Sequence, residues 1–285
     1  MTEPHPLLES VAPRGPVAVI DLVRSPTHET RLAFPGLLKG VLGRTQGRLC
    51  WSGSIDHLLV GRLAEGFQDI FVSAYPHREA CAAALAARAT WQSEHFAGGT
   101  RTWLCAPVPT IGRLAARLLM GTYALRGGGP PPFDPANEPV PDLVQEMTQA
   151  PHLGPDTAGV EALLAADLER PVVMVNFLRH REIAAYAEPA ATPISGAAAY
   201  GRYGRNTVPL IGRLGGRIRW AGTRLRALLE EGEAPWHQIV FVQYPSRAAF
   251  IGMLCSEAYR RGTPHRDAGL EATELVSCTS HDEFF

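Results

Sequence analysis

The chain has 285 residues, of which 46% are hydrophobic and 19% are charged, and its formal net charge is −1. This composition is typical of a globular protein with one or two domains. The near-neutral charge, with no run of Lys or Arg, argues against nucleic-acid binding.

The first half of the chain shows the hydrophobic patterns of four strands and two helices. Short runs rich in apolar and β-branched residues predict strands, and longer stretches with apolar residues on one face predict helices. The expected strands are residues 17–24, 47–53, 67–75 and 101–105, and the expected helices are residues 30–45 and 77–91. The predicted order is therefore β-α-β-β-α-β.

Residues 107–170 are predicted to link the two halves, because the run Gly-Gly-Gly-Pro-Pro-Pro within them breaks regular structure. Short helices are expected around this run, at 111–125, 141–150 and 156–169. The first of them carries Arg113 and Arg117, and it is too short and too charged to span a membrane. We expect it to pack on the protein, with an interfacial membrane helix as the alternative.

The second half predicts the same order of elements. Strands are expected at residues 172–179, 217–222, 237–244 and 270–278, and a first helix at 195–214. Ser195 is a suitable N-cap for this helix, and Gly215 and Gly216 are a stop signal. A second helix is expected to begin after Pro245 and to end at Gly262.

The two halves also match residue by residue at one fixed offset, without a gap, over roughly forty positions, as in a domain duplication. The matches place Gly43, Arg44, Trp51, Gly53, Tyr75 and Pro76 on Gly212, Arg213, Trp220, Gly222, Tyr244 and Pro245. We therefore predict a tandem duplication, with domains at 16–106 and 171–279 and the linker at 107–170.

A single β-α-β-β-α-β unit leaves one face of its sheet bare, and a bare sheet face must be buried. Two units in one chain can bury each other's faces. The predicted fold class is therefore α+β, with two ferredoxin-like modules that form a dimeric α+β barrel within one chain. A cavity is expected where the two sheets meet, and a homodimer of the whole chain remains an alternative.

Four strings of the second half carry a family resemblance: VVMVNFLRHRE, GGRIRWAG, WHQIVFVQYPSRAAFIGML and AYRRGTPHRDAGLEATELV. In this order they resemble a family of dimeric α+β barrel proteins known only as a numbered domain of unknown function. The resemblance implies a ferredoxin-like module but no reaction. The wider superfamily includes cofactor-free monooxygenases, lactone isomerases, polyketide cyclases, haem enzymes and stress proteins, so fold alone does not fix function.

Three polar residues interrupt apolar strands of the second half: Asn176, Arg219 and Gln243. The first half has Asp21, Cys50 and Ala74 at the equivalent positions. Burying an amide or a guanidinium is unfavourable unless it is hydrogen-bonded or meets a ligand. We therefore expect the site to lie mainly in the second half. The alternative is that these residues satisfy one another or face solvent.

His265 and Arg266 are the next candidates, between the last helix and the last strand. A His can exchange protons near neutral pH, and Arg can hold a carboxylate or enolate oxygen. The alternative is that His265 caps the end of the helix.

Two tyrosines, Tyr200 and Tyr203, could line the mouth of the cavity and donate hydrogen bonds, and aromatic packing is the alternative. The first half has Phe34 in the place of Tyr203. Arg24 and Arg179 recur at strand ends in both halves, as do Trp51 and Trp220 inside strands. Recurrence in the plainer first half favours structural roles for all four.

Five cysteines stand at wide spacings without a Cys-x-x-Cys pair: Cys50, Cys81, Cys105, Cys255 and Cys278. This pattern favours reduced thiols over disulfides or a zinc site. Residues 1–15 do not resemble a secretory signal, so we expect a cytoplasmic protein. The scattered histidines form no metal-binding motif, and no nucleotide-binding motif is present. No metal is expected.

The leading hypothesis is a cofactor-independent enzyme that acts on a small molecule by acid–base chemistry, as an isomerase, cyclase or monooxygenase. His265 would transfer the proton, Asn176 and Tyr203 would complete the catalytic set, and Arg219, Arg266, Gln243 and Tyr200 would bind the substrate. The alternatives are a non-catalytic ligand-binding or interaction protein, and a haem protein with His265 or His95 as iron ligand.

Overall fold

The computed structural model describes residues 6–11, 15–95, 99–134, 153–155, 157–188, 192–228 and 234–281. Its first module consists of β1 (Val17–Val23), α2 (His28–Arg44), β2 (Arg48–Val60), β3 (Asp69–Tyr75), α3 (Arg78–His95) and β4 (Thr100–Pro107). A short helix, α1 (Pro6–Val11), precedes it. Each of the strands and helices expected in the first half is present, and β2 extends further than expected.

The linker contains α4 (Thr110–Arg126) and α6 (Thr157–Ala165). They correspond to the first and third helices expected there, and the expected helix at 141–150 lies outside the described residues. The second module consists of β5 (Val172–His180), α7 (Gly196–Arg213), β6 (Arg217–Ala227), β7 (Gln238–Tyr244), α8 (Arg247–Cys255), α9 (Glu257–Gly269) and β8 (Leu270–Ser280).

The eight strands of the described residues form one closed barrel, in the order β1-β3-β2-β8-β5-β7-β6-β4. Each module contributes its strands in the same ferredoxin-like order, β4-β1-β3-β2 and β8-β5-β7-β6. Antiparallel pairing of β2 with β8 and of β4 with β6 closes the barrel between the modules. The predicted α+β class, with two ferredoxin-like modules forming a barrel in one chain, is confirmed. The tandem duplication and the domain boundaries remain predictions.

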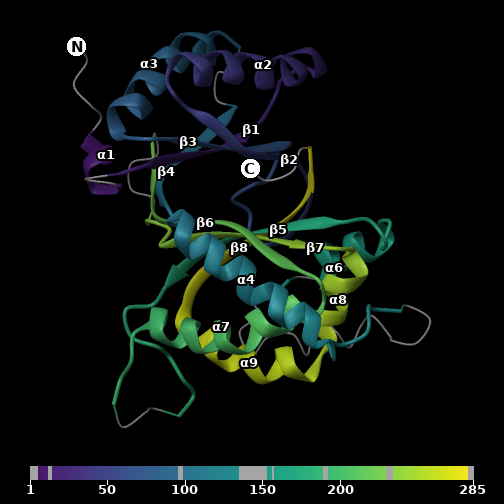
Figure 1. Ribbon diagram of the computed structural model, residues 1–285. Coiled ribbons are helices and arrows are strands. Elements are labelled where there is room, and N and C mark those ends of the chain that lie inside the picture. Colours follow the sequence, from purple (N-terminus) through teal and green to yellow (C-terminus); the bar gives the residue numbers. More distant parts are fainter. Residues whose placement is uncertain are drawn as a thin grey trace.

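The helices cover the outside of the barrel, α2 and α3 over the first module and α7 and α9 over the second (Figure 1). Strand residues point alternately inward and outward. In β5, Val175 and Phe177 belong to the core of the barrel, whereas Met174 belongs to the core between the sheet and the helices. Two faces of the second sheet are thus available for a site, one inside the barrel and one under its helices.

The inside of the barrel is filled with aromatic side chains. Trp51 and Trp220 contact Phe241 with ring centroids 5.1 and 5.4 Å apart, and Trp103 lies 5.4 Å from Phe177. All five side chains are at most 2% exposed. The cavity predicted where the two sheets meet was therefore wrong, because large rings from both modules interdigitate there. Trp51 and Trp220 are core residues, as predicted.

Two recurring arginines stack on aromatic rings at matching places. The guanidinium of Arg24 lies 4.8 Å from the ring centroid of Phe67, and that of Arg179 lies 4.8 Å from the ring centroid of Trp236. Arg24 also donates to the backbone oxygens of Glu65 and Gly66. Cation–π stacking therefore gives both arginines the structural role expected of them.

The helical segment after Pro245 differs from the expectation. It breaks at Ser256, whose side chain accepts a hydrogen bond from the backbone N–H of Tyr259 and caps α9. The helix then continues through Gly262, the predicted end. A Cβ at Gly262 would lie 3.3 Å from the ring of Tyr203, so this glycine permits close packing of α9 on α7 and does not act as a stop. Consequently His265 and Arg266 lie on a helix and not in a loop.

No helix among the described residues is long and apolar enough to cross a membrane.

Candidate ligand-binding cavity

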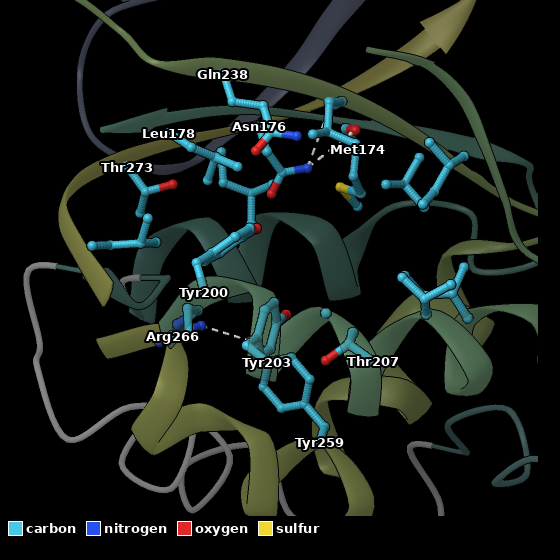
Figure 2. Close-up of a pocket in the computed structure, with 18 of the residues that line it drawn as sticks. Met174, Asn176, Leu178, Tyr200, Tyr203, Thr207, Gln238, Tyr259, Arg266 and Thr273 are labelled. Carbon is cyan, nitrogen blue, oxygen red and sulfur yellow. Dashed lines mark hydrogen bonds between the residues drawn. The ribbon is translucent and has the colours of Figure 1, made fainter. Parts of the chain in front are cut away.

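A cavity of about 490 Å³ lies in the second module, between its sheet and its helices (Figure 2). This volume is within the range of roughly 300–1,000 Å³ found for small-molecule sites. The four strands β5, β6, β7 and β8 form one wall, and α7, α8 and α9 form the other. The first module and the linker also contribute, through Val60, Leu153 and Pro155.

The cavity has an apolar end and a polar end, because of the strand register. Met174 pairs with Val242 at one end, and Leu178 pairs with Gln238 and Thr273 at the other. The helices add apolar side chains from Ile211, Phe250, Met253 and Leu254, and polar ones from Tyr200, Tyr203, Tyr259 and Arg266. Such a cavity suits a molecule with an apolar body and a polar group.

Four aromatic side chains that line the cavity contact one another in sequence at its polar end. His180 lies 5.3 Å from Tyr200, Tyr200 lies 5.3 Å from Tyr203, and Tyr203 lies 6.1 Å from Tyr259, measured between ring centroids. Figure 2 shows that the Tyr200 ring reaches from the helices towards the sheet. The rings therefore form one continuous surface across the polar end.

The hydroxyls of Tyr200 and Tyr203 make no hydrogen bond to another described residue. Burial raises the pKa of both hydroxyls far above the usual value. Both phenols are therefore protonated at neutral pH and can donate hydrogen bonds to a ligand.

Asn176 lies in the middle of β5, on the wall formed by the sheet. Its Nδ2 donates to the backbone oxygen of Met174 at 3.3 Å and, less favourably, to that of Val240 at 3.5 Å (Figure 2). These bonds fix the orientation of the amide. Among the described residues none donates to its Oδ1, which is thus the acceptor that Asn176 can offer to a ligand.

Arg266 is buried beside the helical wall, with 7% of its surface exposed. Its Nε donates to Oδ1 of Asp267 at 3.0 Å, and its Nη1 donates to the hydroxyl of Tyr259 at 2.6 Å. Burial opposes the charge and lowers the pKa of Arg266, but Tyr259 and Asp267 outweigh burial and raise it above the usual value. Arg266 therefore stays charged inside the protein.

His180, at the end of β5, lines the cavity and was missed by the sequence analysis. Burial, and to a smaller extent the neighbouring His237, lower its pKa to about 4. Its backbone N–H donates to Nδ1 of His237 at 2.9 Å, and its own Nε2 is buried without a partner among the described residues. Alternation from Asn176 would have found it, because residues 176, 178 and 180 share one face of the strand.

Three of the predicted site residues are not among those that line the cavity. Gln243 and Arg219 bond to each other, with Nε of Arg219 donating to Oε1 of Gln243 at 2.6 Å. Val242 and Tyr244 line the cavity, so Gln243 between them faces the opposite side of the sheet. The two residues thus hydrogen-bond to each other, which was the predicted alternative to a role in the site.

His265 lies on α9, where Nδ1 is 2.8 Å from the hydroxyl of Tyr186. Burial lowers its pKa, and so do the charges of Arg202 and Arg205. The structure thus brings together Asn176, Tyr200, Tyr203 and Arg266, but not His265. The catalytic role of His265 remains a prediction, and this cavity does not support it.

The equivalent space in the first module is filled. Phe34 and Tyr75 belong to a buried apolar cluster there. Nη2 of Arg88 lies 2.6 Å from Oδ1 of Asp21, and neither side chain has any exposed surface. Asp21 also accepts a hydrogen bond from Thr102 at 2.7 Å. The ligand-sized space is therefore a feature of the second module.

In the part of the chain that the structure describes, no group of three or more His, Cys, Asp or Glu side chains is arranged to hold a metal ion.

The fold and the cavity define the class: an α+β barrel within one chain, with a ligand-sized space in its second module. Residues 181–277 match the family described as "Domain of unknown function (DUF1330)". The chain belongs to this family through its second half. A protein of unknown function from Rhodopseudomonas palustris is 34% identical over 44% of this chain and 93% of that one, with a TM-score of 0.41.

More distant structures align with nearly the whole chain. A proposed monooxygenase from Lactobacillus acidophilus has 9% identity, covers 94% of both chains and has a TM-score of 0.45. Chlorite dismutase from Candidatus Nitrospira defluvii, in complex with imidazole, has 10% identity, covers 93% of this chain and 91% of that one, and has a TM-score of 0.41. No curated protein matches the chain.

Proposed function

We propose that the protein binds a small, largely apolar molecule in the cavity of the second module and acts on it by acid–base chemistry. The observation that carries this proposal is the cavity itself, apolar at one end and rich in hydrogen-bonding groups at the other. The first module serves as a filled, structural counterpart that closes the barrel.

His180 takes the proton-transfer role in this proposal, because it lines the cavity and His265 does not. With a pKa of about 4 its ring is neutral at neutral pH and free to accept a proton, although it is a weaker base than an ordinary His. Nδ1 is the ring nitrogen left for the transfer, since Nε2 is fully buried.

A carbonyl compound illustrates the step. His180 takes a proton from the carbon next to the carbonyl, and the negative charge moves to the carbonyl oxygen. The phenols of Tyr200 and Tyr203 donate hydrogen bonds to that oxygen. If the compound has a C=C bond between its β and γ carbons, the charge also reaches the γ carbon; return of the same proton to that carbon shifts the double bond to the α,β position and completes an isomerisation, with no change in the number of atoms or electrons. Asn176 orients the substrate from the sheet.

A non-catalytic ligand-binding protein is the second candidate. The filled interior of the barrel favours it, because it leaves no reaction space between the two modules. The two candidates differ in one observable property, the transfer of protons to and from a bound molecule.

Haem fits the described residues poorly. The ring of His180 packs between Tyr200 and His237, and its Nε2 has no exposed surface to offer to iron. His265 is not among the residues that line the cavity, and the side chain of His95 lies outside the described residues. A visible absorption spectrum tests this alternative, because bound haem gives an intense Soret band.

The cavity is tested with N-phenyl-1-naphthylamine, a neutral dye that fluoresces in apolar surroundings. A Cβ at Gly204, which lines the cavity, would meet no atom within 4 Å, so Gly204→Leu should place its side chain without a backbone clash. We expect this variant to lose dye binding. Gly36→Leu, at an equally open glycine of α2, is the control and should bind normally.

The chemistry is tested by hydrogen exchange into D₂O. A panel of aryl and cyclic ketones is incubated with the protein, and mass spectrometry measures the uptake of deuterium next to the carbonyl. We expect His180→Gln to slow exchange by about 10²-fold or more, as is usual when an acid–base group is removed. Dye binding without exchange of any ketone would instead identify a binding protein.

A further inference from the structure

The described residues that line the cavity include a positive charge and no negative charge. Among the described residues that line it, Arg266 is the ionised side chain at neutral pH, and no Asp, Glu or Lys is present. Asp267 balances the charge of Arg266, but Asp267 is not part of the lining. The positive member of this ion pair is therefore the one nearer the cavity, and a cationic ligand would be disfavoured.

Arg266 is poorly placed to bind a ligand by itself. Its Nε is bonded to Asp267, and its Nη1 is bonded to the hydroxyl of Tyr259. Its Nη2 lies 2.9 Å from the same Asp267 oxygen, without hydrogen-bond geometry, and has no exposed surface. Nε and Nη1 thus already donate hydrogen bonds within the protein, and Nη2 has no exposed surface. The positive charge of Arg266 therefore affects a ligand through the hydroxyl of Tyr259.

Tyr259 is suited to transmit this charge. Its hydroxyl accepts a hydrogen bond from Arg266 at 2.6 Å, so its own proton is still available. A phenol that accepts from a cation becomes a stronger donor, because hydrogen bonds in a chain polarise one another. The ring is 3% exposed and makes an edge-on contact with Tyr203, which holds its position.

We propose that the ligand carries an anionic oxygen group on an apolar body, and that Tyr259, oriented by Arg266, binds this oxygen. Carboxylates, sulfonates and enolates belong to this class. The neighbouring phenols of Tyr200 and Tyr203 supply further donors, and the opposite end holds the apolar body between Met174 and Phe250. This inference rests on the proposed function, since it specifies what the same cavity takes.

Two dyes separate the inference from the proposal on which it rests. 1-Anilinonaphthalene-8-sulfonate has the ring system of N-phenyl-1-naphthylamine with one added sulfonate. Wild-type protein should bind both dyes, and each dye should displace the other. Tyr259→Phe removes only the hydroxyl, so binding of the sulfonate should weaken about ten-fold or more, in line with the loss of a hydrogen bond to a charged group. Binding of the neutral dye should stay within about two-fold.

Tyr75→Phe is the matched control. Tyr75 is 1% exposed and lies in the first module, its hydroxyl accepts a hydrogen bond from Oγ of Ser73 at 3.5 Å, and it is not among the residues that line the cavity. This variant should bind both dyes normally. Near-ultraviolet circular dichroism of each variant confirms that the packing is intact.

The outcomes are distinct. If the neutral dye binds but the sulfonate does not, or if Tyr259→Phe weakens both equally, the anionic head group is refuted and the cavity stands. If neither dye binds to the wild-type protein, the proposed function itself is refuted. A sulfonate-specific loss in Tyr259→Phe alone supports the inference.

Discussion

Asp21 and Asn176 occupy matching positions in the two modules, Asp21 opposite Phe71 in β3 and Asn176 opposite Val240 in β7. Both lie in the first strand of their module. Asp21 forms a fully buried ion pair with Arg88, whereas Asn176 borders a cavity. The matching positions thus belong to a filled core in the first module and to the lining of a cavity in the second.

The effects of substituting Arg88 and Asp21 on the free energy of unfolding should depend strongly on each other. Arg88→Met leaves the buried carboxylate of Asp21 without its cation, which should cost about 3–5 kcal/mol of unfolding free energy. The double variant, with Asp21→Asn added, should recover much of this loss, because Asn still accepts from Thr102 and carries no charge. Urea unfolding measures both. Simple addition of the two single effects would show that the residues are not coupled.

Gly204→Leu should change stability and binding in opposite directions. Leucine is a better helix former than glycine by about 0.5–1 kcal/mol, and the position is free of nearby atoms. The variant should therefore unfold at an equal or higher urea concentration while losing the neutral dye. A variant that loses both stability and binding would mean that the space is not available to a side chain.

His180 should make the protein less stable in mild acid. Its pKa is about 4 in the folded protein and near 6.5 in the unfolded chain, so the unfolded state takes up the proton first as the pH falls. Stability should decline from about pH 6.5 down to pH 4. Partial exposure limits the effect to roughly 1–2 kcal/mol.

His180→Phe should flatten this decline, which is measured as the difference in urea midpoint between pH 7.5 and pH 5. The surface variant His28→Gln is the control for the loss of a histidine. An unchanged pH dependence in His180→Phe would place the acid sensitivity elsewhere.

His265 and Tyr186 should behave as one structural unit. Tyr186→Phe and His265→Ala each remove one partner of the 2.8 Å hydrogen bond that joins the segment after β5 to α9. Both should destabilise the protein by about 0.5–1.5 kcal/mol and leave dye binding and ketone exchange intact. Loss of exchange in His265→Ala alone would restore the catalytic role first predicted for His265.

Local patterns were sufficient to predict the modules. The alternation in β6 and the apolar run of β5 identified strands, and Ser195 correctly marked the start of α7. Gly262 shows the limit of such signals. It was predicted to end the helix, but it lies inside α9, where it allows close packing against the ring of Tyr203. Tyr203 is distant in sequence and adjacent in space, so a local pattern could not reveal this role.

The sequence by itself determined the order of the elements, the two ferredoxin-like modules and the richer chemistry of the second, because periodicity and residue type act locally along the chain. Only the tertiary structure decided where the space lies. Aromatic rings from both modules fill the barrel, and the helices of the second module leave a gap above β5 and β7 that those of the first do not. Packing of side chains far apart in sequence therefore placed His180, and not His265, in the lining of the cavity and joined Arg266 to Tyr259.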